Sequence, residues 1–548
     1  ITLVVTSAFE EFSKKIPFVD KVVLFDIQNV NKKEITKLLV WIDVYKYLEN
    51  FLSNLKNTNF DLLINLSHSK LSALMISYLK IRNIRGFGCN ENGDRMTFNP
   101  WMQYFGIEPF NRFYNPFNLV EIFTRSAGVT PEDNPIQLSI CNDNSSIKNI
   151  FIKNNINDED VLIGIQAGSS LEGRRWSPEY FAELANGLID TLDVKIVLLG
   201  VESENILAEK IISFSKYSNK IINLVGETNI DQLSLLVKRC HYVVGNDTGT
   251  MHVAAAVGTT TVGLFFAHAH PYETAPYGPG HLIFQARIPC APCSYGVECN
   301  NVICIQKVNP KHLITIIHNH FIDGRWRLTD NVPPLNEVNI YETCIGDDRR
   351  LRLRPLVKKK LTLVDIFREI YSVHWLKFLE PGEFDKVNHC NIASLLLREY
   401  DCSNINILIK QIEVKYSALI EIKELANRGI YIADKIIRLY SEETITQYEE
   451  MKQLCDEIEM LDDRINQTGF IHPEIKPIVD IFSKRKENFQ GNDTIKLSKE
   501  TQKCYEMLID EAGSFYSLLK STCEKVRMLD VDTCYAAVSS INVEVPGK

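Results

Sequence analysis

Short apolar runs alternate with longer amphipathic stretches over residues 1–322, and this pattern predicts an α/β fold. The apolar runs have the length of strands, and apolar residues in the stretches between them recur at three- and four-residue steps. Strands that alternate with helices indicate parallel βαβ units in a doubly wound sheet. In residues 1–135 the expected strands are 1–5, 21–25, 61–66 and 84–87, with helices at 8–15, 32–56 and 69–80.

A polar, proline-marked segment at residues 130–135 predicts a domain boundary. Residues 136–322 then form a second, clearer α/β unit. Ser177 before Pro178 is a typical helix start, because a side-chain cap is followed by a residue that lacks the backbone N–H. The expected strands are 161–167, 195–200, 221–225, 241–244, 260–266 and 281–285, with helices at 178–191, 203–215, 231–238, 250–257 and 309–320.

Residues 323–360 lose this alternation and are predicted to be a linker with short strands. A run of four Arg and three Lys lies in residues 349–360. Such a run either stays solvated in the linker, which we favour, or meets an anionic membrane surface or acceptor. In residues 361–548 apolar residues recur at helical spacing, which predicts a helical bundle or coiled-coil domain. Its default role is assembly, as a homo-oligomer or with a protein partner.

The composition narrows the class of protein. A chain of 548 residues is too long for one core, and a net charge of −9 argues against a nucleic-acid binder. No apolar run approaches the roughly eighteen residues of a transmembrane helix. Fourteen cysteines suit reduced thiols in the cytoplasm. Because the chain begins inside a strand-like run at Ile1, without a Met or a signal peptide, we expect the true N-terminus to lie upstream.

The stretch from residue 241 to 258 predicts an anion site. An apolar strand ends at Val244, a turn carries Asp247 and Thr248, and an Ala-rich helix starts near Gly249 and Thr250. The first N–H groups of a helix have no partners, and the helix dipole is positive there. The turn is therefore predicted to hold a diphosphate.

A second loop follows the strand expected at 161–167. Gly168, Ser169 and Ser170 offer backbone N–H and hydroxyl groups, and Arg174 and Arg175 follow shortly after. An arginine placed against phosphate adds a charge-assisted bond of about 1.5–3 kcal/mol. Each part alone also occurs in proteins that bind no phosphate, but the two loops in this order favour an anion site.

Taken together, the motifs resemble glycosyltransferase family nine, the lipopolysaccharide heptosyltransferases. The resemblance covers roughly residues 1–322 and is weaker in the first half. It implies a GT-B fold, in which two Rossmann-like domains face a cleft that holds a nucleotide-sugar. The matching motifs are Gly168-Ser-Ser170, Arg175-Trp-Ser-Pro178, Asp247-Thr-Gly-Thr-Met-His252 and Pro276-Tyr-Gly278.

The resemblance also assigns roles to single residues. It implies that Asp247 contacts the donor sugar. From its place one turn into the helix, His252 is expected to steady a phosphate oxygen or the turn itself, although a packed structural histidine fits equally well. The resemblance also implies that a glutamate after the second strand of this domain binds the ribose of the donor, with Glu202 the first choice and Glu204 the second. The general base of this family is an aspartate after the first strand, which we expect upstream of this chain. The catalytic residue is therefore unknown.

Four clustered cysteines form a further constellation: Cys290, Cys293, Cys299 and Cys304. Their spacing is consistent with one structural Zn or Fe ion and equally with reduced thiols in a loop. Asp158-Glu-Asp160 precedes a strand instead of ending one, so no catalytic Mg²⁺ or Mn²⁺ is expected.

The residues and the resemblance together predict four regions. They are an acceptor-side Rossmann-like domain (1–135), a donor domain (136–322), a linker (323–360) and a helical domain (361–548). The expected function is metal-independent, inverting transfer of heptose from ADP-heptose to a hydroxyl of a surface glycan, lipopolysaccharide core or protein. The expected location is the cytoplasm, with peripheral association at the inner membrane as an option. The alternative is a non-catalytic nucleotide-sugar-binding or assembly protein that uses its helical region.

Overall fold

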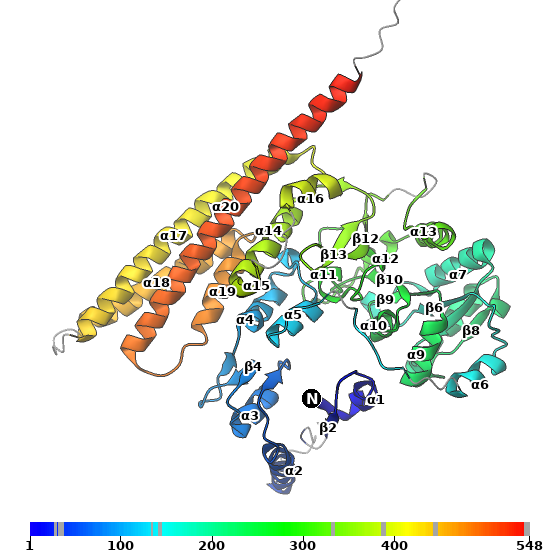
Figure 1. Cartoon of the computed structure of the whole chain (residues 1–548), viewed down its shortest axis with the longest axis horizontal. Coiled ribbons are helices and arrows are strands. Elements are labelled where there is room, and N and C mark those ends of the chain that lie inside the picture. Colours follow the sequence, from blue (N-terminus) through cyan, green and yellow to red (C-terminus); the bar gives the residue numbers. More distant parts are fainter. Residues whose placement is uncertain are drawn as a thin grey trace, which may run out of the picture. The chain divides into compact units, whose positions relative to one another are not determined.

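The structure is a computed structural model that describes residues 1–26, 30, 38–132, 135–140, 145–329, 335–384, 391–441 and 448–541 (Figure 1). Its contacts divide the chain into two compact units. Unit 1 comprises Ile1–Asn59, Glu132–Gly346 and Leu351–Leu356, and unit 2 comprises Phe60–Pro131, Asp347–Arg350 and Val357–Lys548.

An eight-stranded sheet forms the centre of unit 1, with strand order β13-β12-β11-β10-β9-β6-β7-β8. The six strands from β6 to β11 pair in parallel, as the alternating pattern predicts. Two antiparallel strands, β12 and β13, extend it at one edge. The strands are β6 (Leu162–Gln166), β7 (Lys195–Leu199), β8 (Ile221–Asn223), β9 (Tyr242–Asn246), β10 (Thr260–Phe265), β11 (Leu282–Ala286), β12 (Val338–Ile345) and β13 (Leu351–Pro355).

Helices cover both faces of this sheet. Alternate strand residues face opposite sides, so Ile163 of β6 packs in one core cluster and Leu162 in the other. Phe181 and Ile316 join the first cluster, and Leu236 joins the second. The helices are α6 (Ser145–Lys153), α7 (Pro178–Leu192), α8 (Asn205–Phe214), α9 (Ile230–Arg239), α10 (Gly249–Ala256), α11 (Pro271–Thr274), α12 (Ile303–Lys307) and α13 (Pro310–Asp323).

The start of the chain adds a small parallel pair to unit 1. β1 (Thr2–Thr6) pairs with β2 (Lys21–Phe25), and α1 (Glu10–Ser13) lies between them in sequence. α2 (Leu38–Lys56) covers most of the helix expected at 32–56, of which residues 32–37 lie outside the described part.

Unit 2 joins a small α/β piece to the helical region. The α/β piece contains β3 (Leu63–Asn65), α3 (Lys70–Leu79), β4 (Ile84–Cys89), β5 (Arg95–Thr97), α4 (Pro100–Ile107) and α5 (Leu119–Ser126). The helical region contains α14 (Leu363–Leu379), α15 (Pro381–Phe384), α16 (Ile392–Glu399), α17 (Ile405–Ser441), α18 (Tyr448–Ile471), α19 (Lys476–Lys486) and α20 (Thr494–Ile541). The α/β part and the all-α C-terminal region expected from the sequence are confirmed.

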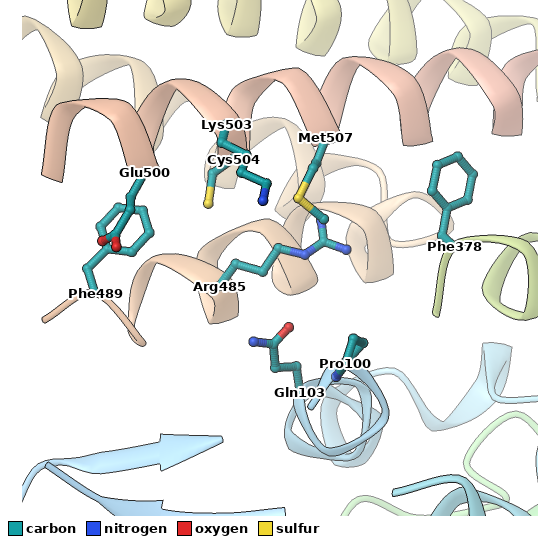
Figure 2. Close-up of a pocket in the computed structure, with 9 residues that line it drawn as sticks. All are labelled: Pro100, Gln103, Phe378, Arg485, Phe489, Glu500, Lys503, Cys504 and Met507. Atoms are coloured by element: carbon teal, nitrogen blue, oxygen red, sulfur yellow. The ribbon is translucent and has the colours of Figure 1, made fainter. Parts of the chain in front are cut away.

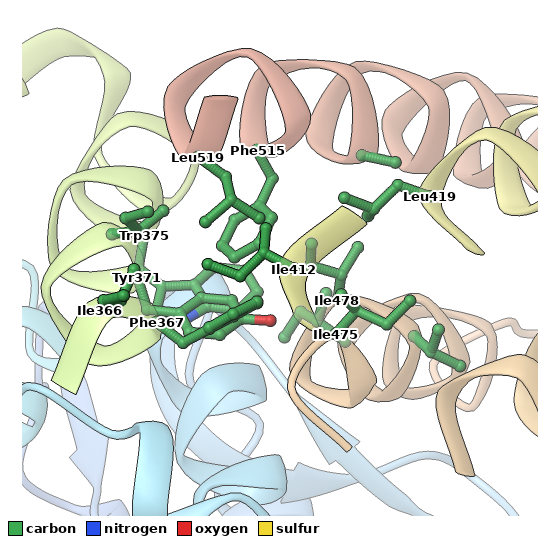
Figure 3. Packing of buried hydrophobic residues seen from close by; sticks show 14 of the residues in the cluster. Ile366, Phe367, Tyr371, Trp375, Ile412, Leu419, Ile475, Ile478, Phe515 and Leu519 are labelled. Carbon is green, nitrogen blue, oxygen red and sulfur yellow. The ribbon is translucent and has the colours of Figure 1, made fainter. Parts of the chain in front are cut away.

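One hydrophobic cluster holds unit 2 together. Tyr371 and Trp375 of α14 stack with a ring-centroid distance of 5.6 Å, and Phe515 of α20 packs against Tyr371 (Figure 3). Trp101 and Phe117, from the α/β piece, belong to the same cluster. Residues 60–131 therefore share their core with the helical region. The sequence pattern had placed them in a separate domain.

The segment predicted to be a linker with short strands contains β12 and β13, which lie at the edge of the main sheet. Its basic residues are also paired. Arg354 forms an ion pair with Glu342, and Arg350 forms a buried one with Asp348. These pairs neutralise part of the basic run.

Candidate functional site

The site lies at the carboxyl ends of two neighbouring strands of unit 1. β6 and β9 pair in register, with Gln166 opposite Gly245, so the loops that follow them lie side by side. A Cβ atom on Gly245 would lie 2.6 Å from the carbonyl oxygen of Gln166. Glycine is therefore needed for the two strands to approach this closely, and the predicted Gly-Ser loop and acidic turn are brought together.

The turn after β9 leads directly into α10. Thr248 has extended backbone angles, and Gly249 is the first residue of the helix, with open space around its missing side chain. Two buried hydroxyls, Ser169 Oγ and Thr248 Oγ1, have no hydrogen-bond partner within the described structure. An unpaired buried hydroxyl costs free energy, so this pair of hydroxyls fits a site for an anion with several acceptor oxygens.

A buried ion pair fixes Asp247. Arg174 donates to its carboxylate and, at 2.9 Å, to its carbonyl oxygen. The Thr274 hydroxyl donates to the same carboxylate at 3.1 Å. Burial raises the pKa of the Asp247 carboxyl, while Arg174, His252 and Thr274 favour its ionised form. Burial also lowers the pKa of His252, and Asp247 opposes this shift. The predicted Asp247 and His252 thus belong to one electrostatic cluster.

Arg175 contacts the backbone of the Gly-Ser loop and not Asp247. Arg175 donates from Nε and Nη2 to the carbonyl oxygen of Ser169, at 2.9 and 2.7 Å. The next residue, Trp176, is fully buried and donates from its indole to the carbonyl oxygen of Val308. Trp176 is a core anchor, which holds the adjacent Arg175 at the loop.

A pocket of about 490 Å³ opens beside these loops. Glu204, the second choice for the ribose, lines this pocket, whereas Glu202, the first choice, is exposed and is not among the lining residues. The carboxylate of Glu204 occupies the space beside Gly168, because a Cβ atom there would lie 1.8 Å from Oε1. The residues that line it include Ser169, Ser170, Arg175, Val201, Glu204 and Ile206.

Sequence reasoning missed Gln166. This residue ends β6, is 3% exposed, and bonds both Thr250 and Glu204. Its signal was a lone polar side chain at the carboxyl end of an otherwise apolar strand. The predicted Thr250 is thereby tied to the strand by its own hydroxyl.

The four clustered cysteines do not form a metal site. Cys290 and Cys299 are exposed, Cys293 is half-buried, and Cys304 is buried in the core on α12. Among the residues the structure describes, no three side chains of His, Cys, Asp or Glu are placed to share a metal ion. The prediction of a structural Zn or Fe site is therefore unsupported by the part of the chain that the structure describes.

Unit 2 contains a smaller cavity of about 240 Å³ (Figure 2). Phe378, Phe489 and Met507 make its wall largely apolar, and Arg485 reaches it from α19. The guanidinium of Arg485 is already paired with buried Glu511 through two bonds of 2.9 and 2.5 Å. This cavity contains none of the residues predicted to bind the donor.

The turn into α10, the two unpartnered hydroxyls and the lined pocket lie at the carboxyl edge of a parallel α/β sheet, where such sheets bind ligands. This arrangement agrees with the predicted GT-B type of fold. Residues 49–301 match the family described as glycosyltransferase family 9 (heptosyltransferase). This part of the chain is therefore similar to heptosyltransferases, and the predicted resemblance and the glycosyltransferase class are confirmed.

Similar proteins carry matching names. The lipopolysaccharide core heptosyltransferase OpsX of Haemophilus influenzae is 24% identical over 277 residues, which are 50% of this chain and 76% of that protein. Lipopolysaccharide heptosyltransferase 2 of Escherichia coli is 34% identical over 113 residues, which are 20% of this chain and 32% of that protein.

Two solved structures are also similar. A glycosyl transferase family 9 protein from Veillonella parvula has a TM-score of 0.47 and 18% identity, over 59% of this chain and 88% of that one. The ADP-heptose lps heptosyltransferase II of E. coli has a TM-score of 0.42 and 19% identity, over 59% of this chain and 90% of that one. Among the helices described, none has a stretch apolar and long enough to traverse a lipid bilayer.

Proposed function

We propose that this protein transfers heptose from ADP-heptose to a hydroxyl of a lipopolysaccharide core acceptor, with inversion and without a catalytic metal. The family match and the names of the similar heptosyltransferases support the reaction and the acceptor. The site supports a nucleoside-diphosphate donor, because loops that suit an anion adjoin a pocket with a carboxylate. A cytoplasmic location, at the inner face of the membrane, suits this acceptor.

The donor's diphosphate lies between the two loops in this proposal. Ser169 and Thr248 donate their unpartnered hydroxyls to phosphate oxygens, and the backbone N–H groups of Gly249 and Thr250 add the positive end of α10. Gly168 and Ser170 complete the loop, and Arg175 adds positive charge beside it. These groups stabilise the charge that develops on the leaving diphosphate as the acceptor hydroxyl attacks the anomeric carbon.

The remaining donor contacts follow from the same placement. Asp247, held by Arg174 and Thr274, accepts a hydroxyl of the sugar, and His252 lies in the same cluster. Glu204 accepts from the ribose hydroxyls, and it replaces Glu202 in this role because it lines the pocket. Val201 and Ile206 present apolar surface to the base.

The unpartnered buried hydroxyls carry the donor-site proposal, and they give it a sharp test. Removing a hydroxyl that forms a hydrogen bond within the protein lowers stability, whereas removing one that bonds only to a ligand does not. Calorimetry should show that Thr248→Ala and Ser169→Ala each weaken ADP binding roughly 3- to 10-fold. Thermal melting should show no loss of stability in either variant. Unchanged ADP affinity, or a loss of stability without a change in affinity, would contradict the site.

Asp247→Ala tests the charged part of the site, with Asp190→Ala as its control. Asp190 also takes part in an ion pair, with Lys216, but on the exposed surface of α7. Asp247→Ala should weaken ADP-heptose binding more than ADP binding, because its contact is with the sugar, and Asp190→Ala should change neither. Transfer is then assayed with ADP-heptose and a heptose-free lipopolysaccharide core. Tight donor binding with no transfer would favour the alternative, a nucleotide-sugar-binding protein.

A further inference from the structure

We infer that Gln166 is a positioning residue that couples the diphosphate loop to the ribose-binding carboxylate. The inference rests on the proposed function, and it adds a link between two parts of the donor site. Its basis is a chain of hydrogen bonds that runs from the start of α10, through the end of β6, to Glu204.

Gln166 bonds to both sides of the site at once. The Thr250 hydroxyl donates to Gln166 Oε1 at 3.0 Å, and Gln166 Nε2 donates to Glu204 Oε2 at 3.1 Å. Gln166 lies at the end of β6, which is paired on both sides, by β7 and by β9. Its backbone is therefore fixed, and the two bonds orient the amide without competition from water.

Glu204 is confined on its other sides as well. The backbone N–H of Val201 donates to the same Oε2 at 3.1 Å. Gly168 and Gly200 border the carboxylate, and a Cβ atom on either would lie 1.8 or 2.5 Å from one of its oxygens. Both donors meet Oε2, so Oε1 is the oxygen we assign to the ribose hydroxyls.

The arrangement has a direct consequence for affinity. A glutamate that must be ordered on binding loses side-chain entropy, whereas one that is already held does not. Gln166 holds Glu204 in place, and Thr250 in turn holds Gln166. Loss of either bond should therefore weaken the recognition of the ribose hydroxyls, even though neither Gln166 nor Thr250 touches them.

The readout is the ratio of two affinities measured by calorimetry, that of ADP over that of 2′,3′-dideoxy-ADP. This ratio isolates the ribose hydroxyls, because both ligands carry the same diphosphate and base. A contact with a carboxylate should make the wild-type ratio roughly 10 to 100. Glu204→Gln, which removes the charge, should reduce the ratio strongly.

Gln166→Met keeps the volume of the side chain and removes both bonds, and we expect it to lower the ratio to below about 3. Thr250→Val breaks only the first bond and should give an intermediate ratio. Gln285→Met is the matched control, since Gln285 is a buried glutamine on β11 of the same sheet, and its ratio should equal that of the wild type. If Gln166→Met does not fold, Thr250→Val tests the same chain of bonds from its half-buried end.

The outcomes separate the two proposals. Wild-type protein that binds neither nucleotide overturns the proposed function. ADP binding with a ratio near 1 overturns the assignment of Glu204 to the ribose, and with it the role of Gln166. A wild-type ratio above 10 that Glu204→Gln abolishes, but that Gln166→Met and Thr250→Val leave unchanged, overturns the coupling alone. A purely structural role for Gln166 would lower both affinities together and leave their ratio intact.

Discussion

Gly168→Ala is the most direct test of how the donor site is built. The backbone of Gly168 is not left-handed, so alanine meets no conformational strain at this position. Its new methyl group would nevertheless lie 1.8 Å from Oε1 of Glu204 and 2.4 Å from Oε2. The carboxylate has to leave its place, and it then loses the bonds from Gln166 and Val201.

The size of the effect follows from what the displaced carboxylate can no longer do. A hydrogen bond to a charged group contributes about 1.5–3 kcal/mol, so loss of the ribose contact should weaken ADP binding roughly 10- to 100-fold. Stability should fall by less than about 1 kcal/mol, because Glu204 is half-buried and its carboxylate can turn to water. The change is therefore expected in affinity far more than in folding.

Calorimetry with ADP and urea denaturation measure these two quantities. Gly173→Ala is the control in the same loop, since its methyl group would meet only the Val302 side chain at an ordinary 3.7 Å. It should bind ADP like the wild type. If Gly168→Ala binds ADP with wild-type affinity, Glu204 does not contact the nucleotide from the position seen in the structure.

Three further predictions concern stability and reactivity. Arg485→Met should lower the free energy of unfolding by about 3–5 kcal/mol in a denaturation assay, because it leaves the buried carboxylate of Glu511 unpaired. Arg464→Met removes an exposed ion pair and should cost less than about 1 kcal/mol in the same assay. Burial lowers the pKa of His281 from 6.5 to about 4, so the unfolded chain takes up its proton first as the pH falls. The free energy of unfolding should therefore drop by up to about 3 kcal/mol between pH 6.5 and 4. In thermal melts across this pH range, His281→Gln should show a smaller drop. If the pH dependence of stability is the same in this variant, His281 is not its source. Exposed Cys290 should react with a thiol reagent in the native protein. Burial raises the pKa of Cys304, which should react only after unfolding. Equal reaction rates of the two thiols would contradict the burial of Cys304.

Local patterns predicted much of the donor half correctly. Ser177 caps α7 and Pro178 begins it, as predicted, because helix starts depend on a few neighbouring residues. The parallel strands from β6 to β11 followed from apolar runs alone. Thr248 and Gly249 stand at the start of α10, as the turn chemistry indicated.

Where the structure differs from the sequence-based expectations, the cause is contacts between residues that lie far apart in the chain. Glu202 and Glu204 are two residues apart, and only the fold shows that Glu204 reaches the glycines after β6 and β7. The four cysteines are close in sequence, and only the structure shows that Cys304 is buried while Cys290 and Cys299 are exposed. The domain limits expected at residues 135 and 322 remain predictions.

The sequence by itself determined the parallel strands and most helices of residues 161–323, the order of the two loops and the resemblance to the family, since these depend on local spacing and on residues that stand in a fixed order. Only the tertiary structure decided that Gln166 joins those loops and that β12 and β13 belong to the main sheet. It also showed that Trp101 packs in the core of the helical region. Hydrogen bonds and packing join residues far apart in the chain, and periodicity along the chain carries no information about which of them meet.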